Sequence, residues 1–450
     1  MTDHDGLPPG PRLGRLHQTI GWWYRPLPWI EQCRQRYGNR FTLRLIGVPP
    51  IVVIADPDEI RQVLTADPDL LLPGVGTRLL EPITGPRSIG LMDGEEHLTE
   101  RKLLMPALHG ERLAAMTATM EAKAEAAITG WPATESIALH PLLITLSLDI
   151  IVAAIARADE ADPRLDQLRE AYADLFAWNA RLPNLVPWMR RSVAGRGPWA
   201  YLLAARARAD ALLYELIAER RAAPAGDTGA DILGFLLAAR YPDGSTMSDQ
   251  QIRDELTTLV AGGHQTLALA LTWAADQLAR TPSVLRQLVA EIDAGDDDAY
   301  LTATVHETLR HRPVIPIGPR HVAHPAMIGD WTYPPGVLLQ AEAYLLHHDP
   351  AVYDDPYAFR PERFLDHPPD TYSWIPFGGG RRRCIGLAFA MLELKIVLRA
   401  LLRARDLRPA GPPVAARRHS IGLVPDDGGR LLLPLRRQNR RLTATASSTG

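Results

Sequence analysis

The residues best suited to do chemistry lie in one stretch near the C-terminal end, Phe377-Gly-Gly-Gly-Arg-Arg-Arg-Cys384-Ile-Gly386. Successive glycines allow positive φ and let a flat group lie against the backbone. We expect Cys384 in the first turn of the helix that follows, where free N–H groups and the neighbouring arginines favour a thiolate. A lone cysteine in such surroundings can be a nucleophile, one ligand of a metal cluster or the axial ligand of a haem.

The spacing of these residues separates the three possibilities. Phe-x-x-Gly-x-Arg-x-Cys-x-Gly resembles the haem-binding signature of the cytochrome P450 family, and the match is made by Phe377, Gly380, Arg382, Cys384 and Gly386. A phosphate-binding loop would need Gly-Lys-Ser/Thr, or Gly-x-Gly-x-x-Gly after an early strand, and neither is present. The resemblance implies haem b with Cys384 as iron ligand, Phe377 and Gly386 beside the cofactor, and Arg382 on a propionate.

A long central helix is predicted between residues 248 and 280. Ser248-Asp-Gln-Gln251 is a capping box, and apolar residues at helical spacing follow it. Two glycines in the middle, Gly262 and Gly263, each cost about 1 kcal/mol relative to alanine and therefore need a reason. Either a bulky group approaches the helix there, or another helix packs closely.

The same segment resembles the family's oxygen-activation motif. The resemblance places Gly262 and Gly263 against the haem face and makes Thr266 the residue that orders a proton-relay water. Gln265 stands where the family has an acid, and it can hold a water but cannot change charge. The proton route must then differ, or run through water alone. His264 lies about 200° from Thr266 around a helix, so it is not expected to reach the iron.

Further cationic residues are candidates for binding an anionic group. His97 and Arg101 are four residues apart and share one helical face, where they can clamp an anion or form an ordinary solvated surface. The resemblance implies contacts between His97, Arg101 and the haem propionates, and adds Arg320, which follows a proline-fixed extended run.

Glu307 and Arg310 are three residues apart. Together with Arg363 they resemble the buried ionic network of the family. Such charges must satisfy one another, so we expect a structural role and a severe loss of stability when one is removed.

The overall composition sets limits on the class of protein. A net charge of -3 over 450 residues gives no basic field for nucleic acid. Two cysteines, no secretory signal and no apolar run of 18 residues predict a cytoplasmic protein without a membrane span. We also expect it to be a monomer. The resemblance implies a mainly α fold with a small β-rich lobe, the cytochrome P450 fold. We expect a single domain over residues 1–436 and a disordered tail over 437–450.

Local patterns fill in part of the remaining chain. Residues 41–54 predict a β-hairpin and residues 57–65 a helix. Residues 73–90 are rich in Gly, Pro and Thr and are interpreted as a long loop that could cover a substrate. Four apolar side chains could roof a pocket or belong to the core: Trp178, Leu182, Leu185 and Trp188.

The resemblance implies a haem-thiolate monooxygenase that activates dioxygen with two electrons and oxidises a small, largely apolar substrate, as in secondary metabolism. No flavin or iron–sulfur segment is evident, so separate ferredoxin and ferredoxin reductase partners are implied, docking near Arg381–Arg383. Three alternatives remain: oxidative coupling on the same haem, a peroxide-driven peroxygenase, and a non-catalytic haem or ligand-binding protein. An intact Thr266 argues against the last.

Overall fold

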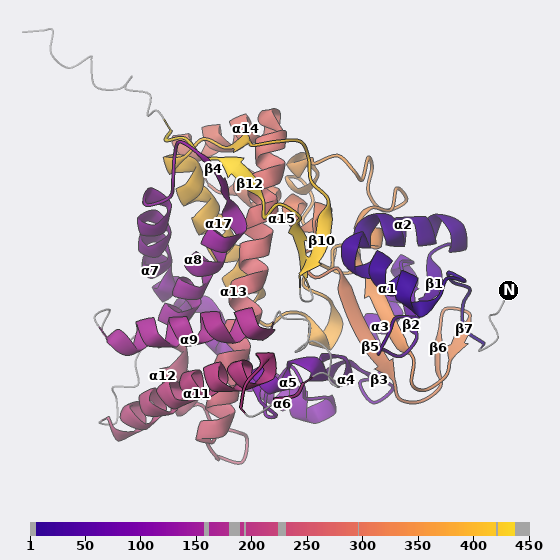
Figure 1. Cartoon of the computed structure of the whole chain (residues 1–450), viewed down its shortest axis with the longest axis horizontal. Coiled ribbons are helices and arrows are strands. Elements are labelled where there is room, and N and C mark those ends of the chain that lie inside the picture. The colour runs from indigo at the N-terminus through magenta and orange to yellow at the C-terminus, as the bar shows by residue number, and fades with distance from the viewer. Residues whose placement is uncertain are drawn as a thin grey trace, which may run out of the picture.

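The computed structural model describes residues 6–156, 162–179, 190–192, 195–223, 231–295, 297–419 and 422–436. The predicted tail at 437–450 lies outside these ranges, as do Leu182, Leu185 and Trp188 of the predicted pocket roof. Figure 1 shows a large helical part and a smaller part built around a β-sheet. The predicted mainly α fold with a small β-rich lobe is confirmed.

Helices make up most of the described chain. Their bounds are α1 (Arg15–Tyr24), α2 (Pro26–Tyr37), α3 (Pro57–Thr65), α4 (Pro73–Thr77), α5 (Glu81–Thr84), α6 (Gly94–Leu104), α7 (Gly110–Thr129), α8 (Leu139–Ile155), α9 (Pro163–Asn179), α11 (Pro198–Ala222), α12 (Ile232–Ala238), α13 (Asp249–Arg280), α14 (Pro282–Ala294), α15 (Ala299–His311), α16 (Ala343–His347) and α17 (Leu387–Ala404).

The strands form one mixed sheet and three smaller ones. Their bounds are β1 (Arg40–Leu43), β2 (Ile51–Ile54), β3 (Leu71–Leu72), β4 (Ser136–Ala138), β5 (Ile317–Val322), β6 (Ala326–Ile328), β7 (Trp331–Tyr333), β8 (Leu338–Glu342), β9 (Arg408–Pro409), β10 (Ala416–His419), β11 (Gly422–Pro425) and β12 (Arg430–Leu432). The mixed sheet has the order β1-β2-β8-β5-β3, with β2 and β8 parallel and the other neighbours antiparallel. The remaining sheets are β4-β12-β9, β10-β11 and β6-β7.

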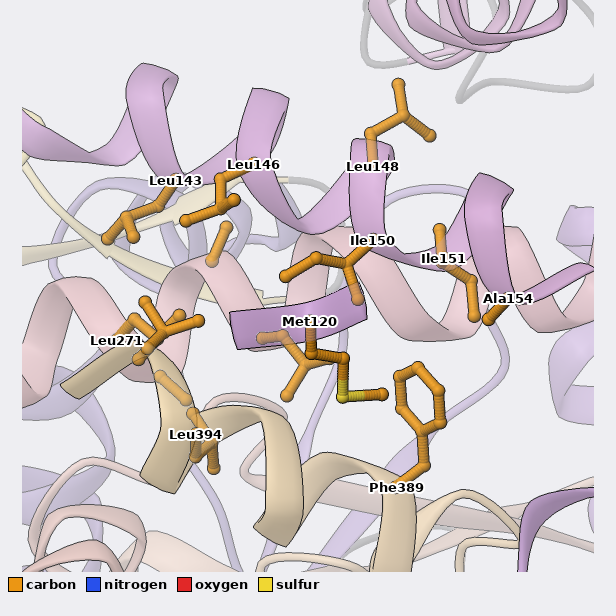
Figure 2. Packing of buried hydrophobic residues seen from close by; sticks show 14 of the residues in the cluster. Met120, Leu143, Leu146, Leu148, Ile150, Ile151, Ala154, Leu271, Phe389 and Leu394 are labelled. Atoms are coloured by element: carbon orange, nitrogen blue, oxygen red, sulfur yellow. The ribbon is translucent and has the colours of Figure 1, made fainter. Parts of the chain in front are cut away.

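The 32-residue helix α13 is the axis of the helical part (Figure 1). Its N-cap is Ser248, which forms the predicted capping box with Gln251. The helix is buried along most of its length because it packs against α8 and α17. Figure 2 shows the core that results, with Met120 of α7, Ile150 of α8, Leu271 of α13 and Phe389 of α17 among the buried side chains.

Two local predictions near the N-terminus are confirmed. Strands β1 and β2 form the predicted antiparallel hairpin, with Phe41 opposite Val53. Helix α3 begins after Asp56, whose carboxylate accepts hydrogen bonds from the backbone N–H groups of Asp58 and Glu59. An acidic N-cap satisfies donors that the first helical turn leaves unpaired, which explains why the helix starts there.

The prediction of a long loop over residues 73–90 is wrong for residues 73–84. The segment 73–90 contains α4, α5 and a short 3-10 helix at Arg78–Leu80. Its C-terminal part is fastened to α13, because the Arg87 N–H donates to the Asp254 carboxylate at 2.9 Å and the Ile89 N–H donates to Glu255 at 2.6 Å. The backbone N–H groups of Arg87 and Ile89 thus find their acceptors in α13, outside their own Gly/Pro-rich segment.

Candidate active site

The loop before Cys384 is fixed by its glycines. Gly378 and Gly380 have φ values of +68° and +61°, which side chains rarely adopt. A Cβ on Gly380 would collide with the carbonyl oxygen of Leu64 in α3, so the loop lies directly against that helix. These glycines therefore permit close packing on α3, whereas the sequence suggested that they make room for a flat ligand.

Cys384 lies just before α17 and is not in its first turn. Its backbone N–H donates to the Phe377 carbonyl at 2.9 Å, and α17 begins three residues later at Leu387. Its side chain is solvent-accessible, although the surrounding protein raises the pKa of the thiol. The Gly386 N–H and the charges of Arg101 and Arg383 act in the opposite direction. The protein alone therefore does not stabilise the expected thiolate form of Cys384. Binding of a metal ion would supply the remaining driving force for loss of the thiol proton.

The four predicted anion-binding residues meet in one place. Burial lowers the pKa of His97 to about 3, and the charges of Arg382, Arg101 and Arg320 lower it further. Burial also lowers the pKa of Arg320 to about 10, again with a contribution from Arg382. His97 is 4% exposed, so the alternative of a solvated helical face is wrong. His97, Arg320 and Arg382 line a common pocket.

Arg382 joins the Cys384 loop to α6 through a residue that the sequence did not identify. Its guanidinium Nη2 lies 2.6 Å from the Asp93 carboxylate and also donates to the Met92 carbonyl. Asp93 in turn accepts the Gly74 N–H at 2.8 Å. Asp93 and Arg382 are 289 positions apart, so no local pattern pairs them, and an acid at the N-cap of α6 is the only sequence signal.

The centre of α13 opens on one side. Gly262 is exposed in the middle of this buried helix, and a Cβ there would meet nothing within 4 Å. The Thr266 hydroxyl donates to the Gly262 carbonyl at 2.6 Å, and Gln265 beside it is half-buried. Gly263 instead faces α8, because a Cβ added to it would lie 3.5 Å from the Ile151 side chain, so it serves helix packing.

His264 points away from the open side of α13. Its ring lies 4.2 Å from that of Phe176 in α9, and its Nδ1 contacts the Val260 carbonyl at 2.7 Å. Burial lowers its pKa to about 4, so the ring is neutral. This position agrees with the expectation that His264 does not reach the iron.

The arrangement fits a planar group that carries carboxylates and a metal ion. Arg320 and Arg382 are cations at one pocket, and the neutral His97 adds a ring N–H donor beside them. These groups would hold carboxylates, because desolvated guanidinium groups gain most from an anionic partner. The accessible Cys384 sulfur offers a soft donor for iron. The open face at Gly262 leaves room for a flat group beside α13.

A buried ionic network connects α15 with the segment around Arg363. Glu307 and Arg310 are both 0% exposed and lie 2.6 Å apart, and Arg363 approaches the same carboxylate at 3.1 Å. Arg310 also donates to the backbone carbonyls of His347 and Pro356. The charges are therefore mutually satisfied, as predicted from the sequence.

Comparison with known proteins agrees with the geometry. The sequence profile of the cytochrome P450 family matches residues 5–427. The protein named cytochrome P450 135B1 of Mycobacterium tuberculosis is 34% identical over 461 residues, covering 100% of this chain and 95% of that protein. Cytochrome P450 138 of the same organism is 34% identical over 430 residues, covering 95% and 96%.

Solved structures show the same fold. A cyanobacterial CYP120A1 with bound retinoic acid superposes with a TM-score of 0.81 at 24% identity, covering 96% of this chain and 99% of the other. The haem domain of cytochrome P450DA gives 0.80 at 23% identity, covering 96% and 98%.

The chain therefore belongs to the cytochrome P450 family, whose members bind haem b iron through a cysteine thiolate and act as monooxygenases. Family membership also implies electron-transfer partners and a small-molecule substrate. Within the described ranges, no helix is both long and apolar enough to cross a membrane.

Proposed function

We propose that Cys384 is the iron ligand, that His97, Arg101, Arg320 and Arg382 hold the haem propionates, and that the protein oxidises a small, largely apolar substrate of secondary metabolism. The observation that carries the proposal is the convergence of three arginines and a neutral histidine near an accessible cysteine. Arg101 connects the group of anion-binding residues with the cysteine, because the Cys384 sulfur and the Arg101 guanidinium interact electrostatically.

Each residue has a distinct task in this proposal. The three arginines would neutralise the carboxylates of the haem, and the neutral His97 would donate a hydrogen bond to one of them. Phe377 and Gly386, close to Cys384 in the sequence, would line the cysteine side of the site. When bound, the haem supplies the chemistry that activates dioxygen. On the opposite side, Gly262 leaves space for dioxygen and substrate, and Thr266 with Gln265 orders the water that delivers protons.

Electrons would come from a separate ferredoxin and its reductase. Arg381 is exposed and Arg383 half-buried in the Cys384 loop, and their charges suit an acidic partner. The two cysteines of the chain are free, which is consistent with a reducing cytoplasm. We further propose that the protein acts as a monomer.

The test is the absorption spectrum of the haem-loaded protein, reduced with dithionite under carbon monoxide. A strongly red-shifted Soret band in the wild type, lost in Cys384→Ala, is the expected result. Cys33→Ala is the matched control, because Cys33 is also a free cysteine but lies buried in α2. A spectrum typical of a neutral ligand in the wild type, or an unchanged band in Cys384→Ala, would overturn the assignment of the ligand.

A second experiment addresses the reaction. The wild type, supplied with NADPH and a heterologous ferredoxin and reductase, is screened against fatty acids, terpenoids, macrolides and aromatic peptides under ¹⁸O₂. Incorporation of one labelled oxygen atom is expected of a monooxygenase. A product formed without label would favour oxidative coupling, and a labelled product formed only with hydrogen peroxide would favour a peroxygenase.

A further inference from the structure

Two buried carboxyl groups, one on α6 and one on α13, are close enough to interact electrostatically. Glu255 of α13 is 0% exposed and Glu100 of α6 is 3% exposed. One oxygen of Glu255 accepts the Ile89 N–H at 2.6 Å, and one oxygen of Glu100 accepts the Tyr241 hydroxyl at 2.8 Å. Among the residues that the structure describes, the second oxygen of each carboxyl has no hydrogen-bond partner. A buried carboxylate so poorly solvated is unfavourable, which favours the carboxylic acid.

The surroundings of both carboxyl groups also raise their pKa values. Burial is the main cause that raises the pKa of Glu255 well above its ordinary value, and the charges of Glu100 and Asp254 raise it further. Burial also raises the pKa of Glu100, with Glu96 adding to the shift and Arg87 opposing it. Both pKa shifts therefore favour the protonated form, and the charge of Glu100 contributes to the shift of Glu255.

Glu255 lies on the same face of α13 as Thr266. The two residues are eleven positions apart, which brings them within about 20° of each other around the helix and about 16 Å apart along it. Thr258 and Gly262 lie between them on this face. The Thr258 hydroxyl lies 2.7 Å from the Asp254 carbonyl oxygen and 2.8 Å from the Ser88 hydroxyl, which places polar groups on this face between Glu255 and the open side of the helix.

The other end of the pair leads to the surface. The Tyr241 hydroxyl, which donates to Glu100, also accepts a hydrogen bond from the Gln251 side chain at 3.0 Å. Gln251 is in turn bonded to Ser248, which is exposed at the start of α13. A chain of hydrogen bonds therefore joins Glu100 to the exposed start of α13.

We propose that Glu255, coupled to Glu100, supplies protons to the reaction at Thr266 and replaces the acid that Gln265 lacks. The inference rests on the proposed monooxygenase function. Placing one atom of dioxygen in a C–H bond with two electrons consumes two protons and releases one water. For each proton, Glu255 gives up its O–H proton through the Thr258 hydroxyl and water, becomes a carboxylate, and is reprotonated from solvent through Glu100.

Glu255→Gln is the sharpest variant for the test. The amide oxygen can still accept the Ile89 N–H, while the transferable carboxyl proton is lost. Glu95→Gln is the matched control, because Glu95 is an exposed acid on α6. Glu100→Gln is a second variant that retains an acceptor for Tyr241 and tests the pair independently if Glu255→Gln does not fold.

The first readout is infrared spectroscopy of the haem-loaded protein near neutral pH. The wild type should show a carbonyl band of a protonated carboxyl that shifts in D₂O and is weakened in Glu255→Gln or Glu100→Gln, but not in Glu95→Gln. An identical band in all four proteins, or none in the wild type, would overturn the proposal.

The second readout is NADPH-driven oxygen consumption with a heterologous ferredoxin and reductase. Because a positioned proton donor contributes about 10²–10⁴-fold and water can substitute in part, we expect Glu255→Gln to be slower by about tenfold or more, with a larger solvent isotope effect. Equal rates in Glu255→Gln and the wild type, with a normal carbon monoxide spectrum in both, would refute the relay alone. An abnormal wild-type spectrum would instead refute the proposed function.

Discussion

The Thr266 hydroxyl donates to the carbonyl of Gly262, 2.6 Å away and one turn earlier in α13. Its hydrogen is engaged by the helix, so the oxygen presents lone pairs to the open side of α13 beside the exposed Gly262. The hydrogen bond fixes the orientation of the Thr266 hydroxyl, so a water that donates to its oxygen would be held in a defined position.

We expect Thr266→Ala to keep the haem and the carbon monoxide spectrum but to release most of the consumed oxygen as hydrogen peroxide. Without the hydroxyl, the proton-carrying water is no longer positioned. The measurement is the ratio of hydrogen peroxide to NADPH consumed. Thr272→Ala is the control, because the Thr272 hydroxyl makes the same bond to the carbonyl four residues earlier, at 2.6 Å, in a buried part of α13. An unchanged ratio in Thr266→Ala would remove the assignment.

Arg382→Ala should weaken haem retention by about 10- to 100-fold. The variant loses charge-assisted hydrogen bonds, which contribute about 1.5–3 kcal/mol each, and leaves Asp93 without its cation. Haem transfer to excess apomyoglobin measures the loss. Arg381→Ala is a matched control because Arg381 is the exposed neighbour in the same loop. Equal transfer rates in the two variants would contradict the role of Arg382.

Glu307→Ala should lower the free energy of unfolding by about 3–5 kcal/mol. It leaves the buried guanidinium groups of Arg310 and Arg363 without their shared carboxylate. Urea unfolding at pH 7 measures the change, with Glu121→Ala, an exposed position on α7, as the control. A loss below about 1 kcal/mol would show that the network is dispensable.

The stability of the protein should depend on pH through Glu393 of α17. Burial raises the pKa of this fully buried carboxyl from 4.5 to about 8, and the Ser147 hydroxyl opposes the shift in smaller measure. The folded state therefore holds a proton that the unfolded chain releases between these values, so this contribution to stability is lost as pH rises from about 4.5 to about 8.

Glu393→Gln should remove that part of the pH dependence. Relative to the wild type, the variant should gain on the order of 4 kcal/mol in unfolding free energy between pH 5 and pH 8, because each pKa unit is worth about 1.4 kcal/mol. Urea unfolding at the two pH values gives the difference. Parallel curves for variant and wild type would contradict the raised pKa of Glu393.

The class of the protein and the elements that carry the site could be predicted without the fold. The spacing from Phe377 to Gly386 is a local pattern, and so is the capping box that begins α13 at Ser248. Helix periodicity and caps depend on residues a few positions apart, which is why they are visible in the sequence. The Glu307, Arg310 and Arg363 network followed from family resemblance, and the structure contains it.

Which groups meet, and how strongly they are desolvated, became evident only from the packed chain. Residues 73–84 form short helices, and Asp254 and Glu255 of α13 hold the backbone of Arg87 and Ile89 that follows them. Asp93 and Arg382 pair across the chain, and burial raises the pKa of the Cys384 thiol against the effect of nearby cations. Long-range contacts and burial arise when distant segments pack together, and no local spacing encodes them.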